Sequence, residues 1–174
     1  SDCTICGAGK YSEAAAQTSD GTCLNCPAGS YNVNNNNNVN DHNQASDCTV
    51  CGGGKYSTTI AAQLSSTCLI CPAGKYNEHS DRSECSECVV GQYRTSLMTP
   101  TECGICAPGQ YQNSANMTSC ELCMVGQYAA RSGYSLCYNC TAGYYANSSG
   151  LTSCTACPIG KYQDRDGSGG CTVC

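Results

Sequence analysis

The chain has 174 residues, of which 20 are Cys and 19 are Gly, and it contains no Phe and no Trp. Val, Leu and Ile together number only 19 of the 174 residues, which is about 11%. Chains with less than about 20% of Val, Leu, Ile and Phe usually do not collapse by apolar burial. An ordinary globular domain with an oily core is therefore excluded. The formal net charge of −5 gives no basic surface for nucleic acid, and no apolar run approaches the length of a membrane span.

The cysteines are arranged as an array of ten Cys-x-x-Cys pairs, whose first members are 17 to 25 residues apart. A near-constant period predicts a tandem repeat protein in which each unit contacts mainly its neighbours. We therefore expect a small disulfide-rich fold, an elongated array of short two-stranded and turn modules with little regular secondary structure. The pairs are Cys3/Cys6, Cys23/Cys26, Cys48/Cys51, Cys68/Cys71, Cys85/Cys88, Cys103/Cys106, Cys120/Cys123, Cys137/Cys140, Cys154/Cys157 and Cys171/Cys174.

A Gly-x-Tyr mark follows the pairs, with Gly three residues and Tyr five residues after the second Cys. Gly is the residue for a turn that needs positive φ or a close backbone approach. Tyr is the only large ring in the chain, so we expect it to lie over the disulfides as a miniature core. The mark occurs nine times, at Gly9/Tyr11, Gly29/Tyr31, Gly54/Tyr56, Gly74/Tyr76, Gly91/Tyr93, Gly109/Tyr111, Gly126/Tyr128, Gly143/Tyr145 and Gly160/Tyr162.

In chain order, residues 1–45 hold repeats 1 and 2, with one possible helical turn near residues 13–18. An Asn-rich stretch at residues 32–43 accounts for the longest spacing between pairs, and we expect a solvated loop there. Residues 46–84 hold repeats 3 and 4. They begin with a block duplication, because residues 1–32 and 46–77 are identical at 20 of 32 positions. A second helical turn is possible near residues 58–64. Residues 85–174 hold repeats 5 to 9 and the first Cys-x-x-Cys of a tenth.

The spacing of the pairs fits two kinds of site. Two Cys-x-x-Cys pairs about 16 residues apart are also typical of a four-cysteine zinc site. Against zinc, no His replaces any Cys of the pattern, and an acidic chain would become more acidic with several tetrathiolate centres. We predict disulfides, with no metal and no cofactor, and keep a zinc-binding four-cysteine scaffold as a third hypothesis.

Two regular connectivities are possible for the disulfides. In an interlaced scheme, Cys3 bonds Cys23 and Cys6 bonds Cys26. In a sequential scheme, the second Cys of each pair bonds the first Cys of the next, which leaves Cys3 and Cys174 as candidates for disulfides to flanking repeats or other copies. We favour the sequential scheme because Gly-x-Tyr recurs once per pair. Its bridges are Cys6–Cys23, Cys26–Cys48, Cys51–Cys68, Cys71–Cys85, Cys88–Cys103, Cys106–Cys120, Cys123–Cys137, Cys140–Cys154 and Cys157–Cys171.

Three acceptor sequons for N-glycosylation occur within residues 116–149, at Asn116, Asn139 and Asn147. A sequon alone is a weak signal, but three in a low-charge chain rich in Ser, Thr and Asn favour a secretory route. We therefore expect covalent glycans and an extracellular or cell-surface location.

The sequence Cys-x-x-Cys-Pro-Ala-Gly-x-Tyr, at residues 23–31 and 68–76, resembles the ephrin-receptor-like cysteine-rich repeat. It is also similar to the first half-module of tumour necrosis factor receptor cysteine-rich domains. The resemblance implies an extracellular, disulfide-laddered rod. It does not imply a particular ligand.

No arrangement of His, Ser or acidic residues in the sequence predicts catalysis, so we do not expect an enzyme. The leading hypothesis is a structural protein, a glycosylated rod that forms a segment or protomer of a filament, cell coat or surface appendage. Its partners would be copies of itself or flanking repeats, joined end to end. The alternative is a ligand-binding ectodomain or stalk of a receptor, for which the irregular spacing near residues 32–47 is the candidate site.

Overall fold

The computed structural model describes residues 6–13, 22–33 and 45–174. Most of the Asn-rich stretch, most of the helical turn predicted near residues 13–18, and Cys3 lie outside these residues. Sheets, bridges and turns are therefore described for these three ranges alone.

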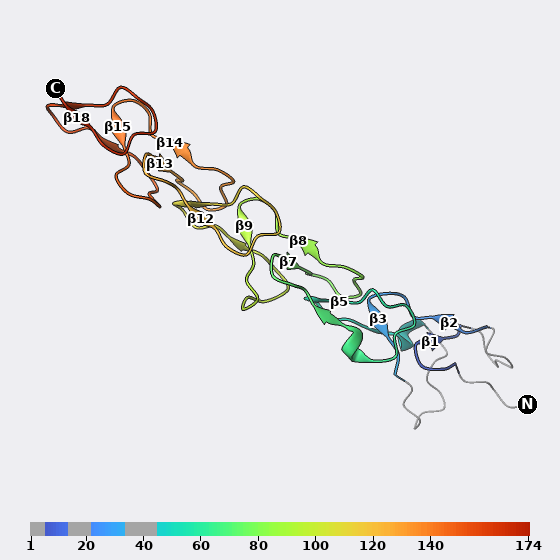
Figure 1. Ribbon diagram of the computed structural model, residues 1–174. Helices are drawn as coiled ribbons and strands as arrows, with labels where there is room; N and C mark the ends of the chain where they lie inside the picture. Colours follow the sequence, from blue (N-terminus) through green and yellow to red (C-terminus); the bar gives the residue numbers. More distant parts are fainter. Residues whose placement is uncertain (1–5, 14–21, 34–44) are drawn as a thin grey trace, which may run out of the picture. The chain divides into compact units, whose positions relative to one another are not determined.

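Within the described ranges the fold consists of nine two-stranded antiparallel sheets, and each sheet comes from one repeat. The first strand is the x-Tyr of a Gly-x-Tyr mark, and the second is the pair of residues inside the next Cys-x-x-Cys. The strands are numbered β1 to β18 in chain order, and Figure 1 labels most of them. The sheets are β1/β2 (Lys10–Tyr11, Leu24–Asn25), β3/β4 (Ser30–Tyr31, Thr49–Val50), β5/β6 (Lys55–Tyr56, Leu69–Ile70), β7/β8 (Lys75–Tyr76, Ser86–Glu87), β9/β10 (Gln92–Tyr93, Gly104–Ile105), β11/β12 (Gln110–Tyr111, Glu121–Leu122), β13/β14 (Gln127–Tyr128, Tyr138–Asn139), β15/β16 (Tyr144–Tyr145, Thr155–Ala156) and β17/β18 (Lys161–Tyr162, Thr172–Val173).

A tight turn leads into the first strand of each sheet, and the repeat glycine makes it possible. In the second repeat, Ser30 N–H donates to the carbonyl of Pro27 at 3.2 Å, which closes a four-residue turn. Gly29, the third residue of that turn, has φ +87°, a conformation that type II turns require and that Gly adopts without a steric penalty. All nine repeat glycines have φ between +77° and +87°. The mark therefore predicts the turn correctly.

Two short 3₁₀ turns each end just before the first Cys of a pair, η2 at Ala45–Asp47 and η3 at Ser65–Thr67. The helical turn predicted near residues 58–64 is wrong, because the backbone there is irregular and the turn begins at Ser65. Leu64 is extended, with φ −133°, and its carbonyl accepts the Thr67 hydroxyl at 2.7 Å. A local Thr contact thus fixes the turn later in the loop than helix propensity suggests.

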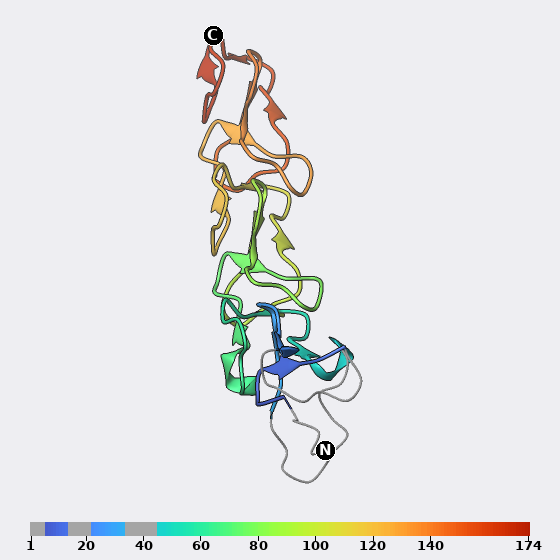
Figure 2. The same cartoon turned by 90° about the vertical axis from the view of Figure 1, so that its right-hand side faces the viewer.

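The backbone contacts divide the chain into two compact units. The first comprises Ser1–Pro72, Tyr76–Ser86 and Thr99–Glu102, and the second comprises Ala73–Lys75, Glu87–Met98 and Cys103–Cys174. Within the second unit, sheets β9/β10 to β17/β18 follow one another in sequence order toward the red C-terminal end (Figure 1, Figure 2).

The buried interior consists of sulfur and small or polar side chains instead of aliphatic ones. The second Cys of each pair from Cys6 to Cys140 is buried, and so is the residue after each Tyr from Ser12 to Ala146. The repeat tyrosines are only half-buried, and Tyr162 is 48% exposed. The rings are thus not among the fully buried side chains, and their expected position over the disulfides stays a prediction.

Candidate functional site

Nine disulfides join the second Cys of one pair to the first Cys of the next, which is the sequential scheme. Their Cα–Cα separations are 5.5–5.8 Å, within the range that unstrained bridges span. Each bridge closes the loop between the two strands of one sheet. Cys174 is free and exposed. The bonded pairs are Cys6–Cys23, Cys26–Cys48, Cys51–Cys68, Cys71–Cys85, Cys88–Cys103, Cys106–Cys120, Cys123–Cys137, Cys140–Cys154 and Cys157–Cys171.

This connectivity replaces the interlaced scheme, because Cys6 bonds Cys23 and Cys26 bonds Cys48. It also leaves the bonded sulfurs without the thiolate that zinc would require. Among the residues that the structure describes, no group of three metal-ligating side chains is brought together. These residues also include no helix of the length and apolar character needed to cross a bilayer. Nine disulfides indicate folding in an oxidising compartment.

Backbone hydrogen bonds connect each repeat to the next through the repeat glycine. Gly109 N–H donates to the carbonyl of Ala129 at 2.8 Å, and its own carbonyl accepts the N–H of Cys123 at 3.0 Å. The N–H and the carbonyl of the glycine are therefore both hydrogen-bonded, and the carbonyl bond fixes the backbone of the second Cys of the following pair. The same pair of bonds recurs at Gly9, Gly29, Gly54, Gly74, Gly91, Gly126 and Gly143.

A second turn packs against the repeat glycine from two repeats further along the chain. A Cβ placed on Gly91 would overlap the carbonyl of Gly133, and one on Gly126 would overlap the carbonyl of Gly167. Most residues at this place in the second turn have positive φ even where they are not Gly, as at Ala61 (φ 55°), whereas Gly54 is covered by the ring of Pro100. The sequence analysis missed this contact, although Gly133, Gly150 and Gly167 recur every 17 residues. Each repeat therefore contacts the next two, rather than its neighbours alone.

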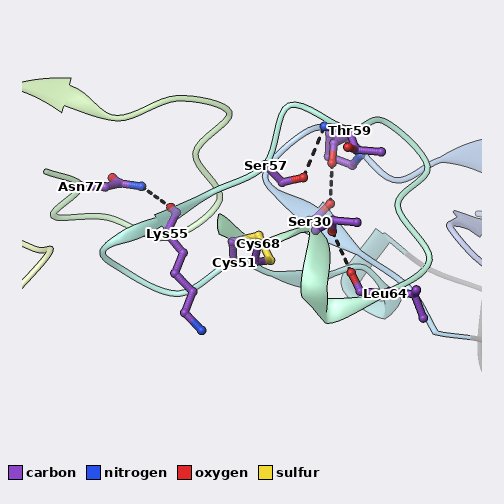
Figure 3. Close-up of a disulfide and its surroundings, with 10 residues drawn as sticks. Ser30, Cys51, Lys55, Ser57, Thr59, Leu64, Cys68 and Asn77 are labelled. Carbon is purple, nitrogen blue, oxygen red and sulfur yellow. Dashed lines mark hydrogen bonds between the residues drawn. A yellow bond between two sulfur atoms is a disulfide. The ribbon is translucent and has the colours of Figure 1, made fainter. Parts of the chain in front are cut away.

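In three repeats the buried residue after the Tyr, which is Asn32, Asn77 or Arg94, links its strand to the preceding repeat through its side chain. Asn77 Nδ2 donates to the carbonyl of Lys55 at 2.7 Å, and Figure 3 shows this bond beside the Cys51–Cys68 bridge. Arg94, which is 1% exposed, donates from Nη1 to the carbonyl of Lys75 at 2.7 Å. Burial lowers the pKa of the Arg94 guanidinium from its ordinary value. No apolar pattern marks these positions, so the sequence analysis missed them.

Tyrosines outside the Gly-x-Tyr mark gather near sheet β13/β14. The ring of Tyr138 lies 6.2 Å from that of Tyr128, its cross-strand partner, and 5.4 Å from that of Tyr134. Such edge and tilted pairs stabilise a small sheet beyond the area they bury. Tyr138 and Tyr144 remain 48% and 46% exposed. This cluster is the main departure from the repeat pattern in the second unit.

Another cross-strand tyrosine contact lies in sheet β11/β12. Tyr111 Oη donates to Glu121 Oε2 at 2.8 Å, and this hydrogen bond, with smaller effects from burial and from the Glu121 charge, raises the pKa of Tyr111. A pKa raised on folding stabilises the protein below the ordinary pKa of tyrosine, and that contribution is lost as the pH rises through the folded-state pKa. The contact is therefore structural at neutral pH.

Each unit contains a pocket. In the first unit, a polar pocket of about 300 Å³ is formed by the loop of the fourth repeat, including His79 and Arg82. In the second unit, a pocket of about 270 Å³ lies beside the tyrosine cluster. The candidate ligand site predicted near residues 32–47 lies largely outside the described residues.

The three predicted glycosylation residues occupy different settings. Asn116 is in the positive-φ turn (φ 63°), and its carbonyl and side chain lie against Gly74. Asn139 is an exposed residue at the end of β14, and Asn147 is exposed in a loop. All three asparagines are exposed, and Asn116 is in addition engaged in packing between repeats.

Residues 126–174 match the family described as tyrosine-protein kinase ephrin type A/B receptor-like. A comparison with curated proteins finds no match. Together with the nine-disulfide ladder, the family match confirms the predicted resemblance to ephrin-receptor-like cysteine-rich repeats. The matched region covers the last repeats, whereas the Cys-Pro-Ala-Gly-x-Tyr segments that suggested the family lie earlier, at residues 23–31 and 68–76.

Proposed function

From the nine-disulfide ladder of this cysteine-rich repeat protein, whose residues 126–174 match the ephrin-receptor-like family, we propose an extracellular structural role. The chain acts as a glycosylated, disulfide-laddered rod, a segment or protomer of a filament, cell coat or surface appendage. It is not an enzyme, and it neither binds nucleic acid nor inserts this segment into a membrane.

The observation that carries this proposal is the uniformity of the contacts between repeats. The same two backbone hydrogen bonds recur at eight successive glycines, and the same glycine packing recurs at intervals of two repeats. Uniform contacts between stacked repeats are typical of quasi-one-dimensional arrays, and this uniformity supports a spacer or filament.

The surface around the last two repeat glycines, Gly143 and Gly160, can receive further repeats. Within the described part of the chain, nothing lies within 4 Å of the Cβ positions of Gly143 and Gly160, although both have the positive φ of the covered glycines. A further repeat of the same kind, in the same chain or in another copy, fits this surface. Cys174, free and exposed, and Cys3 would supply disulfides to it.

The test is to purify the secreted chain without reductant and to follow its length by sedimentation and negative-stain electron microscopy as its concentration rises. The structural role predicts end-to-end multimers that reductant shortens and that Cys3→Ser with Cys174→Ser abolishes. Monodisperse short monomers at all concentrations would count against it.

The second candidate is a ligand-binding ectodomain or stalk, favoured by the family match and by the exposed tyrosine cluster around Tyr138. It predicts monomers that bind one partner through repeats 7 and 8. Loss of that partner on Tyr138→Ala, with unchanged disulfides, would support it over the structural role. A zinc scaffold, in contrast, predicts free thiols and metal in the intact mass.

A further inference from the structure

One of the three sequons coincides with the pocket of the second unit. Asn139 and Thr141, the first and third residues of the sequon, both line it, together with Tyr128, Tyr144 and Ser153. Neither Asn116 nor Asn147 contributes to that pocket. The first and third residues of the sequon therefore border one cavity.

The Asn139 side chain is held in a defined orientation. Gln127 Nε2 donates to Asn139 Oδ1 at 3.0 Å, which places the amide oxygen toward Gln127 and Nδ2 on the other side of the amide group. Nδ2 is the atom that carries the sugar in a glycosylated asparagine. In the two preceding repeats this position is Ile105 and Leu122, whose side chains lie over Gly133 and Gly150. Asn139 lies over Gly167 in the same way, so it brings a polar side chain to a packing position that is aliphatic in those two repeats.

The chemistry of the pocket suits a neutral sugar ring. Its walls are two tyrosines, two hydroxyl side chains, Asn139 and the bridged Cys154, and no Lys, Arg, Asp, Glu or His lines it. Aromatic faces pack against the C–H face of a pyranose, and hydroxyl groups exchange hydrogen bonds with its edge. A volume of about 270 Å³ lies just below the range of about 300–1,000 Å³ for drug-sized ligands, so the pocket suits a group no larger than one sugar residue.

We propose that Asn139 carries an N-linked glycan whose first sugar lies in this pocket, between Tyr128 and Tyr144. The proposal rests on the extracellular part of the proposed function, because the donor is a lipid-pyrophosphate-linked oligosaccharide of the secretory route. A bond forms between Asn139 Nδ2 and the anomeric carbon of the first sugar, while the bond from that carbon to the pyrophosphate oxygen breaks. The lipid pyrophosphate leaves, and a base of the transferase takes one amide proton.

The experiment uses the full chain, secreted from eukaryotic cells and kept oxidised. Peptide mapping after enzymatic release, which converts a glycosylated Asn to Asp, is expected to find Asn139 occupied. The release rate from folded protein is then compared for wild type, Tyr144→Ala and Tyr162→Ala. Tyr162 is the matched control, since it is 48% exposed against 46% for Tyr144 and lies outside the pocket.

Release at Asn139 is expected to be at least about tenfold faster from Tyr144→Ala than from wild type or Tyr162→Ala, and equal for all three after reduction. Tyr144→Phe keeps the ring and should protect like wild type, and a disulfide map checks the fold of each variant.

An oxidised, secreted chain with unmodified Asn139 would overturn the glycan, and a release rate indifferent to Tyr144 would overturn its place in the pocket. Free thiols at most of the bridged cysteines, rather than at Cys174 alone, would overturn the proposed function instead.

Discussion

The glycine of each Gly-x-Tyr mark meets two separate requirements. Its positive φ forms the turn before the first strand, and its missing side chain admits the carbonyl of a turn two repeats further on. Gly126 and Gly143 separate the two requirements, because they have nearly equal φ, +85° and +84°. Of these two, Gly126 is covered by Gly167, whereas no described residue covers Gly143.

We predict that Gly126→Ala destabilises its repeat more than Gly143→Ala does. Gly143→Ala brings only the left-handed backbone penalty, about 1–2 kcal/mol, whereas Gly126→Ala adds an overlap that costs about 1–3 kcal/mol more. Hydrogen exchange at the amides of Cys140 and Cys157, which donate to the Gly126 and Gly143 carbonyls, measures each effect locally. Equal losses of amide protection in the two variants would show that the contact between Gly126 and the Gly167 turn does not contribute to stability.

Arg94 is the buried residue after the repeat Tyr, and it carries a charge. The equivalent residues of the neighbouring repeats, Asn77 and Gln112, are buried and neutral. We predict that Arg94→Ala costs about 2–3 kcal/mol, because it removes the donor to the Lys75 carbonyl and leaves a cavity. Arg94→Gln should change the stability by less than about 1 kcal/mol, since a neutral donor avoids burying a cation. Exchange of the Gly74 amide, which donates to the Arg94 carbonyl, reports both. A loss in Arg94→Gln as large as in Arg94→Ala would mean that the charge itself stabilises the repeat.

At the scale of the element, each repeat is a two-stranded sheet that is too small to be stable alone. The disulfide closes its loop, and the backbone bonds of the repeat glycine join it to the next sheet. Neither feature depends on apolar side chains, and the residues inside the second strand are often exposed, as at Leu24, Leu69 and Leu122. The sheet is therefore positioned by its neighbours and its bridge.

We predict that replacing both Cys123 and Cys137 by Ser loosens a limited set of repeats. A bridge across a loop of this length contributes about 3 kcal/mol, and each repeat contacts the next two in each direction. Hydrogen exchange should therefore rise in sheets β9/β10 to β17/β18 and stay unchanged in β3/β4 and β5/β6. Cys174→Ser, which removes no bridge, is the control. Loss of protection throughout the chain would contradict a linear array.

The hairpins and the turns could be predicted from the sequence because their determinants are local. Cys-x-x-Cys sets the second strand, and Gly at a fixed offset sets the turn, as at Gly29. The positive-φ turns at Ala61, Asp81 and Asn116 could not be predicted, because these residue types do not require that conformation. Their backbone is set by hydrogen bonds from another repeat, such as Asp81 N–H to the Cys51 carbonyl.

The candidate site was only partly foreseen for the same reason. The sequons are local, so Asn139 could be named from the sequence, but the pocket that it lines also needs Tyr128 from the other strand and Tyr144 from the next repeat. Polar residues such as Ser57 and Gln112 gave no sign that they would be buried. A chain whose interior is sulfur and backbone lacks the apolar periodicity from which burial is normally predicted.

At the scale of the whole molecule, the sequence predicts an elongated array. A compact chain of 174 residues has a radius of gyration of about 16 Å by general scaling, and an extended ladder must exceed this clearly. Small-angle X-ray scattering of the oxidised monomer measures it, with Cys174→Ser included to prevent disulfide-linked multimers. A value near that of the compact chain would contradict the rod.

In this protein, disulfides take the place of an apolar core. Hydrogen exchange of the reduced and alkylated chain, compared with the oxidised chain at the same pH and temperature, tests it most directly. In each repeat the amide of the second Cys of a pair donates to the carbonyl of a repeat glycine. We predict that these Cys amides lose their protection in every repeat once the bridges are removed. Persistent protection of those amides in the alkylated chain would contradict the claim, because side-chain packing alone would then hold the fold.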